Sequence, residues 1–317
     1  MSAAMAPLRG IVLICIAFSV LTLMSAFVKA AGETVPTGQV VFFRAFLSLP
    51  IISLWLWSRG DLHNGLHVEN WKSHALRGLV GTVSMGLGFA AISLLPLAEV
   101  QAIRFATPMF LVVFAAVFLG EVFRLVRLGA VVIGMIGVII IVAPEFEPDN
   151  LGSMALIGAG MALASAALAA LAQTLIKAMS GTERSEAIAF YFLATAAFCA
   201  FLTLPLGWIW PDAFGWVWPT PYEMAMLAGC GVLGAVGQML LTASYKFADA
   251  SALAPFSYVS MLWAVIIGFV WFGEVPQAAT FAGAALIIAS GVLIVLRERK
   301  LAKDATARRK LRAKGMY

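Results

Sequence analysis

The sequence predicts an all-α integral membrane protein with ten transmembrane helices, arranged as two inverted five-helix repeats. Three observations lead to this fold class. The chain is 62% hydrophobic and 12% charged, whereas soluble domains are about 45–50% apolar and about 25% charged. Ten of its apolar runs are long enough to cross a bilayer. The two halves of the chain are also similar to each other over a long internal repeat.

The membrane spans are predicted from apolar runs of about 17–25 residues, the length that a helix needs to cross a hydrocarbon core of about 30 Å. They cover residues 8–29, 38–57, 74–95, 99–119, 125–143, 152–177, 185–208, 222–246, 251–272 and 278–296. The first run lacks the basic start of a signal peptide beyond Arg9 and is long enough to span, so we expect the mature protein to retain it.

The internal repeat is clearest between residues 97–122 and 247–275. Each segment has a carboxylate near its start and a proline inside an apolar run, and each closes on Gly-Glu-Val; the matching residues are Glu99 with Asp249 and Pro108 with Pro255. Five spans is an odd number, so two copies of the unit must enter the membrane from opposite sides. We therefore expect one repeat over residues 1–144, an external linker over 145–151, a second repeat over 152–296 and a basic cytoplasmic tail over 297–317.

The fifth and tenth spans are rich in small residues. These are Gly129, Gly134 and Gly137 in the fifth span and Gly283, Ser290 and Gly291 in the tenth. Small side chains allow helices to approach closely in lipid, where no hydrophobic force drives their association. The pattern predicts close helix packing at these two spans.

The positive charges of the connections predict the orientation. With a cytoplasmic N-terminus, the inner loops receive nearly all Lys and Arg residues and the C-terminal tail, while the outer loops hold the acidic stretch 145–149 and the Trp-rich segment 208–218. Cytoplasmic loops carry an excess of Lys and Arg. We expect a multi-pass inner-membrane protein with both termini in the cytoplasm. The basic tail has no interleaved aromatic residue before Tyr317, so we expect it to contact lipid or solvent rather than nucleic acid.

These features together resemble the EamA family of the drug/metabolite transporter superfamily. The resemblance rests on the ten-span layout, the doubled five-helix unit, the Gly-Glu pairs that end the fourth and ninth spans, and the glycine-rich fifth and tenth spans. It covers residues 8–296 and implies a carrier of amino acids, riboflavin, S-adenosylmethionine, other metabolites or drugs. It implies neither the cargo nor the direction of transport.

Two arginines within predicted spans are candidates for substrate binding, Arg44 and Arg104. A charge at the bilayer centre costs at least about 2.5–3.5 kcal/mol, so an ionisable residue in a span is a functional candidate. Gln101, Arg104 and Pro108 share a helical face, and Pro108 frees a backbone carbonyl near the guanidinium. The alternative roles are an ion pair of Arg104 with Glu99 or snorkelling to the interface, and for Arg44 a tether between helices.

The second half supplies neutral polar candidates for the opposite wall. These are Gln238, Thr242 and Tyr245 in the eighth span and Pro255 and Tyr258 in the ninth, with Phe89 and Phe105 adding aromatic surface from the first half. Hydrogen bonding between helices is the alternative role of the polar residues. Glu99 and Asp249 stand at predicted helix starts, where a carboxylate is stabilised by the helix dipole, and either could bind a coupling proton or ion.

The sequence therefore predicts a gradient-driven carrier that alternates access to a midplane cavity. We expect a substrate with a carboxylate, such as an amino acid or an organic acid; a flat ring-containing cofactor or drug is the alternative. An enzyme or a channel is disfavoured, because the spans hold no catalytic motif and long apolar stretches interrupt the polar sites. No cofactor or metal is expected, since the three cysteines form no close-spaced pair. The sequence leaves the choice between monomer and homodimer open.

Overall fold

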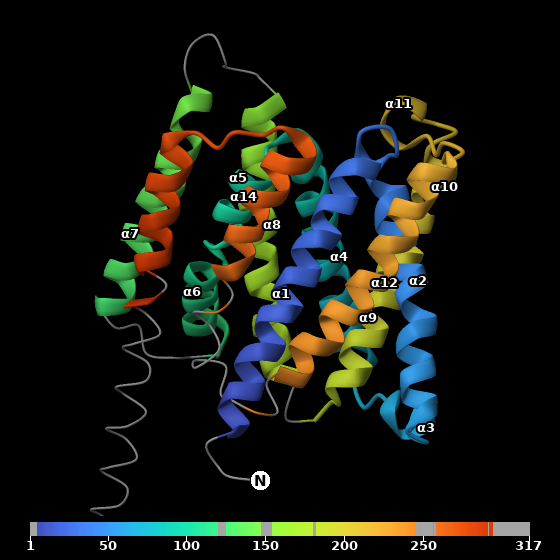
Figure 1. The fold of residues 1–317 in the computed structure, drawn as a ribbon. Helices are drawn as coiled ribbons and strands as arrows, with labels where there is room; N and C mark the ends of the chain where they lie inside the picture. Colours follow the sequence, from blue (N-terminus) through green and yellow to red (C-terminus); the bar gives the residue numbers. More distant parts are fainter. Residues whose placement is uncertain are drawn as a thin grey trace, which may run out of the picture.

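The protein is a bundle of helices, described here from a computed structural model (Figure 1). The structure describes residues 5–119, 125–146, 154–179, 182–244, 247, 256, 258–290 and 292–293, and these form helices and connecting turns without any strand. Parts of the predicted repeats and the basic tail lie outside the described residues.

The first half contains seven α-helices and a short 3₁₀ helix. They are α1 (Met5–Gly32), α2 (Thr37–Ser58), α3 (Leu62–Gly65), α4 (Trp71–Leu94), α5 (Leu97–Arg104), α6 (Thr107–Leu119), α7 (Leu125–Val142) and η1 (Ala143–Phe146). The second half contains α8 (Met154–Met179), α9 (Ser185–Phe201), α10 (Thr203–Leu206), α11 (Pro211–Phe214), α12 (Pro221–Ser244) and α14 (Val259–Phe272), followed by the helix Ala278–Ser290.

Six of the described helical segments are long and apolar enough to cross a membrane. They are Leu8–Gly32, Thr37–Ser58, Trp71–Leu94, Met154–Met179, Ser185–Leu206 and Pro221–Leu241, and three shorter apolar helices accompany them, Val132–Val142, Val259–Phe272 and Ala278–Ser290. The fourth predicted span, expected as one helix over 99–119, is divided into α5 and α6. The total of ten spans stays a prediction.

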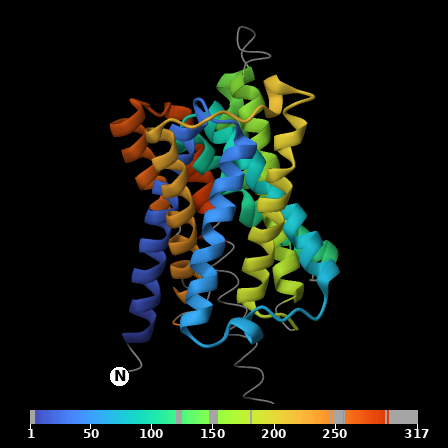
Figure 2. The ribbon, with the colours of Figure 1, turned by 90° about the vertical axis from the view of Figure 1, so that its right-hand side faces the viewer.

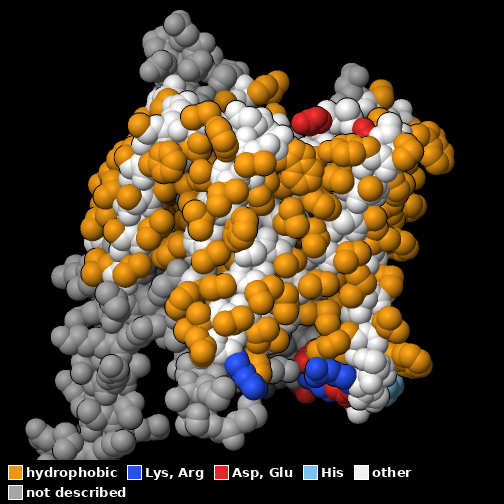
Figure 3. All heavy atoms as spheres, viewed as in Figure 1, with side chains coloured by type: hydrophobic (Ala, Val, Ile, Leu, Met, Phe, Trp, Pro, Cys, Tyr) orange, Lys and Arg blue, Asp and Glu red, His pale blue; other side chains and the backbone are white. Residues whose placement is uncertain are grey.

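The outer surface is apolar, as a lipid-facing surface must be. Over the middle of the helices the face shown in Figure 3 is covered mainly by hydrophobic side chains, with Lys and Arg side chains at its lower end. The exposed large side chains include Ile16, Leu54, Leu79 and Phe198, each near the middle of or well within a long helix. A soluble monomer rarely exposes contiguous apolar area on this scale.

The long helices pack in pairs, and each pair joins a helix from the first half of the chain to one from the second half. Helix α1 packs along α12, and α4 packs along α8, while α2 and α9 contact each other. In Figures 1 and 2, α1 runs upward from the end marked N and its counterpart α8 runs downward. Exchanging the halves converts the α1–α12 pair into the α8–α4 pair, which is the relation that an inverted repeat requires.

Contacts of single glycines show the same correspondence between the two halves. In each half, two glycines three residues apart on one helix lie against the facing helix, and a β-carbon built on either would meet a side chain there. The four contacts are Gly78 with Thr195, Gly81 with Phe192, Gly231 with Leu47, and Gly234 with Arg44. The two halves therefore use the same small-residue packing to hold α4 against α9 and α12 against α2.

Helix α7 and the helix Ala278–Ser290 are in close backbone contact. A β-carbon built on Gly137 would lie 2.7 Å from the backbone oxygen of Gly283, and one built on Gly134 would lie 2.7 Å from Ser290 Oγ. A backbone oxygen cannot rotate away as a side chain can. The expected close packing of the fifth and tenth spans is confirmed at these four residues, whereas Gly129 has open space beside it.

We predict that Gly137→Leu destabilises the protein, because the new side chain has to push the two helices apart. Overpacking of this kind costs about 1–3 kcal/mol. The matched control is Gly129→Leu on the same helix, which gains helix propensity without a clash. Thermal unfolding in detergent measures both variants, and equal melting temperatures would refute the close approach of the two helices.

Candidate functional site

The fourth predicted span is broken where its arginine and proline stand. Helix α5 ends at Arg104, α6 begins at Thr107, and Pro108 has no backbone N–H to donate to the carbonyl of Arg104. The hydroxyl of Thr107 donates to that carbonyl instead, at 2.7 Å. The break therefore leaves the Arg104 carbonyl satisfied, and it places a guanidinium beside irregular backbone inside the bundle.

The side chain of Arg104 is accessible although its neighbours are not. Ile103 is 1% exposed and Ala106 is 0% exposed, while Arg104 and Pro108 are exposed and Gln101 is partly exposed. Gln101, Arg104 and Pro108 thus share the accessible face, as the helical spacing predicts.

Arg104 forms no ion pair with any residue in the part of the chain that the structure describes. The suggested partner Glu99 is 6% exposed in the first turn of α5, and its Oε1 lies 3.4 Å from Thr280 Oγ1, at the start of the last described helix. The structure thus gives no support to the ion pair between Arg104 and Glu99.

Two aromatic candidates meet next to the broken helix. The rings of Phe105 and Tyr258 are edge to face, with centroids 5.0 Å apart. Tyr258 Oη donates a hydrogen bond to the carbonyl of Ile288 at 3.4 Å, which ties the start of α14 to the last described helix. Phe105 follows Arg104 in the chain, so an aromatic surface lies close to the guanidinium.

Arg44 lies inside the protein and lacks partners for part of its guanidinium. It is 7% exposed, and its Nε and Nη1 atoms have no hydrogen-bond partner among the described residues. It packs near Met24 of α1 and Gly234 of α12. An orphaned cation inside a helical bundle is expensive, and natural proteins seldom keep one without a functional reason.

The remaining candidates from the sequence differ in burial, and three of them lie outside the described residues. Phe89 is 4% exposed in the main hydrophobic core, so a substrate reaches it only if helices separate. Gln238 is partly buried on α12 and Thr242 belongs to the same helix. Tyr245, Asp249 and Pro255 lie outside the described residues.

A junction around Lys29 is the polar site that sequence reasoning missed. Lys29 Nζ lies 2.6 Å from Glu274 Oε1, and it donates to the carbonyls of Leu95 at 2.6 Å and Ile92 at 3.3 Å. Glu274 Oε2 accepts from the backbone N–H of Leu97 at 2.8 Å. Lys29 therefore caps the end of α4 rather than its own helix, and it joins α1, the turn between α4 and α5, and the end of α14.

The Gly-Glu pair of the repeat explains how Glu274 reaches this junction. Gly273 ends α14 in the left-handed conformation at φ 67°, which glycine adopts without strain. The backbone N–H of Glu274 then donates to the carbonyl of Gly268 at 2.9 Å, and that of Gly273 donates to the carbonyl of Phe269 at 3.2 Å, so the end of the helix closes on its own backbone. The glycine stops the helix and the carboxylate turns back toward Lys29. The Gly-Glu pair was the available signal for this junction.

A second junction closes the opposite end of the bundle. Glu183, between α8 and α9, accepts backbone hydrogen bonds from Asn70 at 2.7 Å and Glu69 at 3.1 Å, and its Oε2 lies 3.1 Å from His74 Nε2. The contact at the equivalent place in the other repeat is weaker. There Thr34, between α1 and α2, donates to the carboxylate of Glu223 at the start of α12. The contact at one end is thus a buried acid and base, and its counterpart at the other end is an exposed hydroxyl and acid.

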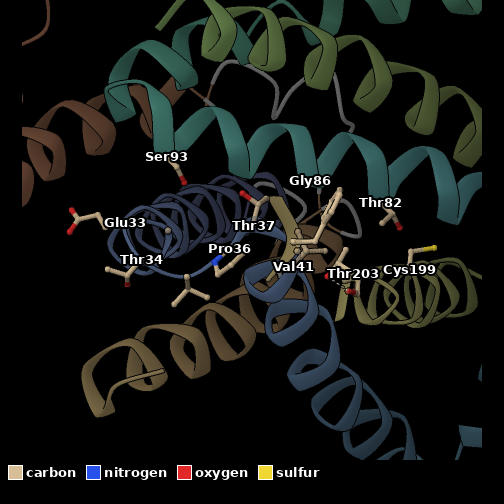
Figure 4. Close-up of a pocket in the computed structure, with 15 residues that line it drawn as sticks. Glu33, Thr34, Pro36, Thr37, Val41, Thr82, Gly86, Ser93, Cys199 and Thr203 are labelled. Atoms are coloured by element: carbon tan, nitrogen blue, oxygen red, sulfur yellow. Dashed lines mark hydrogen bonds between the residues drawn. The ribbon is translucent and has the colours of Figure 1, made fainter. Parts of the chain in front are cut away.

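A cavity of about 490 Å³ opens at the end of the bundle where α1 meets α2. Its lining comes from the turn between these two helices, the middle and end of α4, the end of α9, α10 and α11 (Figure 4). None of the arginine or tyrosine candidates lines it. The cavity escaped sequence reasoning because it depends on where four separate segments converge.

Comparison with known proteins identifies relatives along the whole chain. The model of the EamA-like transporter family matches residues 8–143 and 156–296. The pseudopaline exporter CntI of Pseudomonas aeruginosa is 30% identical over 285 residues, which cover 90% of this chain and 95% of the relative. A crystal structure with 21% identity has a TM-score of 0.61, covering 95% of this chain and 99% of the solved one, and shows the same fold.

Two further relatives are named as transporters of other molecules. The S-adenosylmethionine uptake transporter of Rickettsia felis is 26% identical over 275 residues, covering 86% of this chain and 87% of the relative. The riboflavin transporter of Vibrio cholerae is 26% identical over 267 residues, covering 84% and 85%. The relatives are thus all named as transporters or exporters, while the molecules in their names differ.

We predict that Lys29→Met lowers stability strongly, because it leaves the Glu274 carboxylate at a largely buried junction without its cation. Removing one partner of a buried pair costs about 3–5 kcal/mol. The double variant Lys29→Met with Glu274→Gln should recover part of that loss in thermal unfolding. The control is Asp61→Asn, which breaks the exposed pair with Arg184 and should change little. A Lys29→Met variant as stable as the wild type would rule out a stabilising junction.

We predict that the stability contributed by Glu183 depends on pH. Burial alone would raise the pKa of Glu183, but the hydrogen bond from Asn70, the adjacent His74 and the hydrogen bond from Glu69 together lower that pKa below its ordinary value. A carboxyl with a lowered pKa in the folded state stabilises above its unfolded pKa and loses this contribution as the pH falls through the folded one. The gap in melting temperature between wild type and Glu183→Gln should therefore be widest near pH 7 and shrink below about pH 4. A constant gap would contradict the pairing.

Proposed function

The chain belongs to the EamA-like transporter family, and we propose that it is a secondary active transporter for a small metabolite with a carboxylate or other anionic group. The observation that carries the proposal is the accessible Arg104, which stands without an ion-pair partner among the described residues at the break between α5 and α6. Guanidinium groups bind carboxylates through paired hydrogen bonds that are shorter and stronger than neutral ones. A carboxylate substrate supplies the counterion that the protein does not.

Arg44 supports the same substrate class from the other side of the bundle. Its orphaned Nε and Nη1 atoms lie between α1, α2 and α12, helices that belong to both halves. Motion of one half against the other changes the surroundings of such a residue first. Arg44 is then available to an anion in the state in which α12 and α2 separate.

Alternating access follows from the packing of helices of one half against helices of the other half. The α1–α12 and α8–α4 pairs surround the centre of the bundle, and a junction ties the halves together at each end. Rocking the pairs opens one end while the other stays closed, which is how inverted-repeat carriers work. The proposed setting is the inner membrane with both termini in the cytoplasm. Glu99, a buried carboxylate beside Thr280, is the proposed site for a coupling proton.

A flat ring-containing substrate is the second candidate. The edge-to-face pair of Phe105 and Tyr258 beside Arg104 offers a surface for a planar ring. Relatives named for S-adenosylmethionine and riboflavin transport favour the same possibility. The two candidates differ in their dependence on Arg104, so one assay separates them.

We predict that Arg104→Ala abolishes stabilisation and transport of the native anionic substrate. Loss of a charged hydrogen-bonding group costs about 1.5–3 kcal/mol, or about 10- to 100-fold in affinity. The measurement is a thermal-shift screen of the purified protein against amino acids, organic acids, S-adenosylmethionine and riboflavin, followed by uptake into proteoliposomes.

The matched control is Arg59→Ala, at the end of α2, where the guanidinium lies over the ring of Trp55 at the surface. It should leave the stabilised ligand and its affinity unchanged. Stabilisation by an anion that persists in Arg104→Ala would refute the proposed anion site. Stabilisation by a flat ring compound in both variants would favour the second candidate.

A further inference from the structure

The segment that joins α9 to α12 carries a group of exposed tryptophans. This α10–α11 connector covers residues 202–220 and includes the short helices α10 and α11. Trp208 is 85% exposed, Trp210 is 56% exposed and Trp218 is 100% exposed, and Ile209 is exposed as well. A folded protein seldom leaves several large apolar side chains uncovered in one segment unless they contact a partner.

The exposed tryptophans also differ from their partly buried neighbour in hydrogen bonding. Trp216 Nε1 donates to Thr203 Oγ1 at 2.8 Å, within the connector. The indole N–H groups of Trp208, Trp210 and Trp218 donate to none of the residues that the structure describes. An indole has an apolar body and one polar donor. The protein supplies a partner for the donor of Trp216, and the other three need one from outside.

The backbone of the connector is satisfied mainly by the protein itself. The backbone N–H groups that donate to carbonyls of the connector are those of Trp208, Ile209, Trp210, Phe214 and Gly215. Val217 has both backbone groups bonded to the side-chain amide of Gln39, at 2.9 Å and 3.1 Å. A loop in water can leave such groups to the solvent, whereas a segment in lipid has to satisfy them internally. The connector thus has the hydrogen bonding that a lipid environment requires.

Charge and continuity point to the same environment. Asp212 is the one charged residue in the sequence of the connector. Phe198 and Phe201, near the end of α9, are exposed on the segment that leads into it. In Figure 3, hydrophobic side chains continue from the side of the bundle to the part that Figure 1 labels α10 and α11. The apolar surface of the connector is therefore continuous with the lipid-facing surface of the helices.

From these observations we infer that the α10–α11 connector lies in the interfacial layer of the membrane and that Trp208, Trp210 and Trp218 bind phospholipid. Their rings pack against the upper part of the acyl chains, and their N–H groups donate to ester carbonyls. Indole suits this layer because one side of it is apolar and the other is polar. With a cytoplasmic N-terminus the leaflet is the outer one. The inference goes beyond the proposed function, because it assigns a lipid site away from the residues proposed to bind substrate.

The connector also links this lipid contact to the cavity. Thr203 and Phe214 line the cavity from the connector, and Thr37 and Gly38 line it from the start of α2. Gln39, the next residue of α2, holds the connector through its two bonds to Val217. Lipid that holds the connector therefore also holds one wall of the cavity.

The test measures the membrane depth of spin labels in the full-length chain, with Cys15→Ala, Cys199→Ala and Cys230→Ala. A nitroxide is attached at Trp208→Cys or at Trp218→Cys, and the protein is reconstituted in phosphatidylcholine vesicles. Oxygen concentrates in the bilayer and a nickel chelate stays in water, so the ratio of their collision rates rises with depth. The matched control is Glu33→Cys, an exposed position at the same end, on the turn between α1 and α2. We expect the ratio to be at least threefold higher at both connector positions than at the control.

A second measurement observes the tryptophans themselves. In vesicles of brominated phosphatidylcholine, the emission of the wild type is compared with that of the triple variant Trp208→Phe, Trp210→Phe and Trp218→Phe. The difference between the two spectra belongs to the three indoles. We expect bromine near the carbonyl end of the acyl chains to quench this difference more strongly than bromine near the methyl end.

Equal collision ratios at the connector and at the Glu33→Cys control place the connector in water and overturn the inference. Spin–spin broadening at Trp218→Cys with a low ratio indicates a second copy as the partner, and it overturns the inference too. Difference emission that neither brominated lipid quenches refutes the contact between indoles and lipid. Arg104→Ala should change none of these readings, so failure of the proposed anion site and failure of the lipid site give different results.

Discussion

Every backbone polar group inside a bilayer has to be satisfied within the protein, and this constraint shapes each irregular point of the structure. The break at Arg104 is possible because Thr107 donates to the carbonyl that Pro108 leaves free. The end of α14 at Gly273 closes on its own backbone, and the end of α4 is capped by Lys29 from another helix. At these three places the backbone groups are satisfied by a side chain or by the backbone itself, and Arg104, Lys29 and Glu274 stand at them.

Helices of one half pack against helices of the other half, so the two ends of the bundle are built from equivalent segments but differ in the residues that join them. Small residues hold α4 on α9 and α12 on α2 through the same contacts in each half. The end junctions are not equal, because Glu183 and His74 are buried while the hydroxyl of Thr34 meets Glu223 at the surface. Symmetry thus supplies the framework of the bundle, and the different residues at the two end junctions give each end its own chemistry.

The charged side chains of the bundle divide into those that are paired and those without a counterion among the described residues. Arg104 and Arg44 have no counterion among the described residues, whereas the cavity where α1 meets α2 has acceptors and a carboxylate but no cation in its described lining. Lys29 and Glu274 neutralise each other and serve structure. A buried charge that is paired stabilises the fold, and one that is left accessible is available for a ligand.

The sequence alone determined the membrane class, most of the span positions and the close packing of Gly134, Gly137, Gly283 and Ser290, because hydropathy and residue size are local properties that any lipid-embedded helix has to respect. It also brought Gln101, Arg104 and Pro108 onto one face. Only the tertiary structure decided that Lys29 pairs with Glu274, that Arg44 Nε and Nη1 have no partner among the described residues, and that Phe89 is core. Those outcomes depend on the register at which helices from opposite halves cross, which no single segment of the sequence contains.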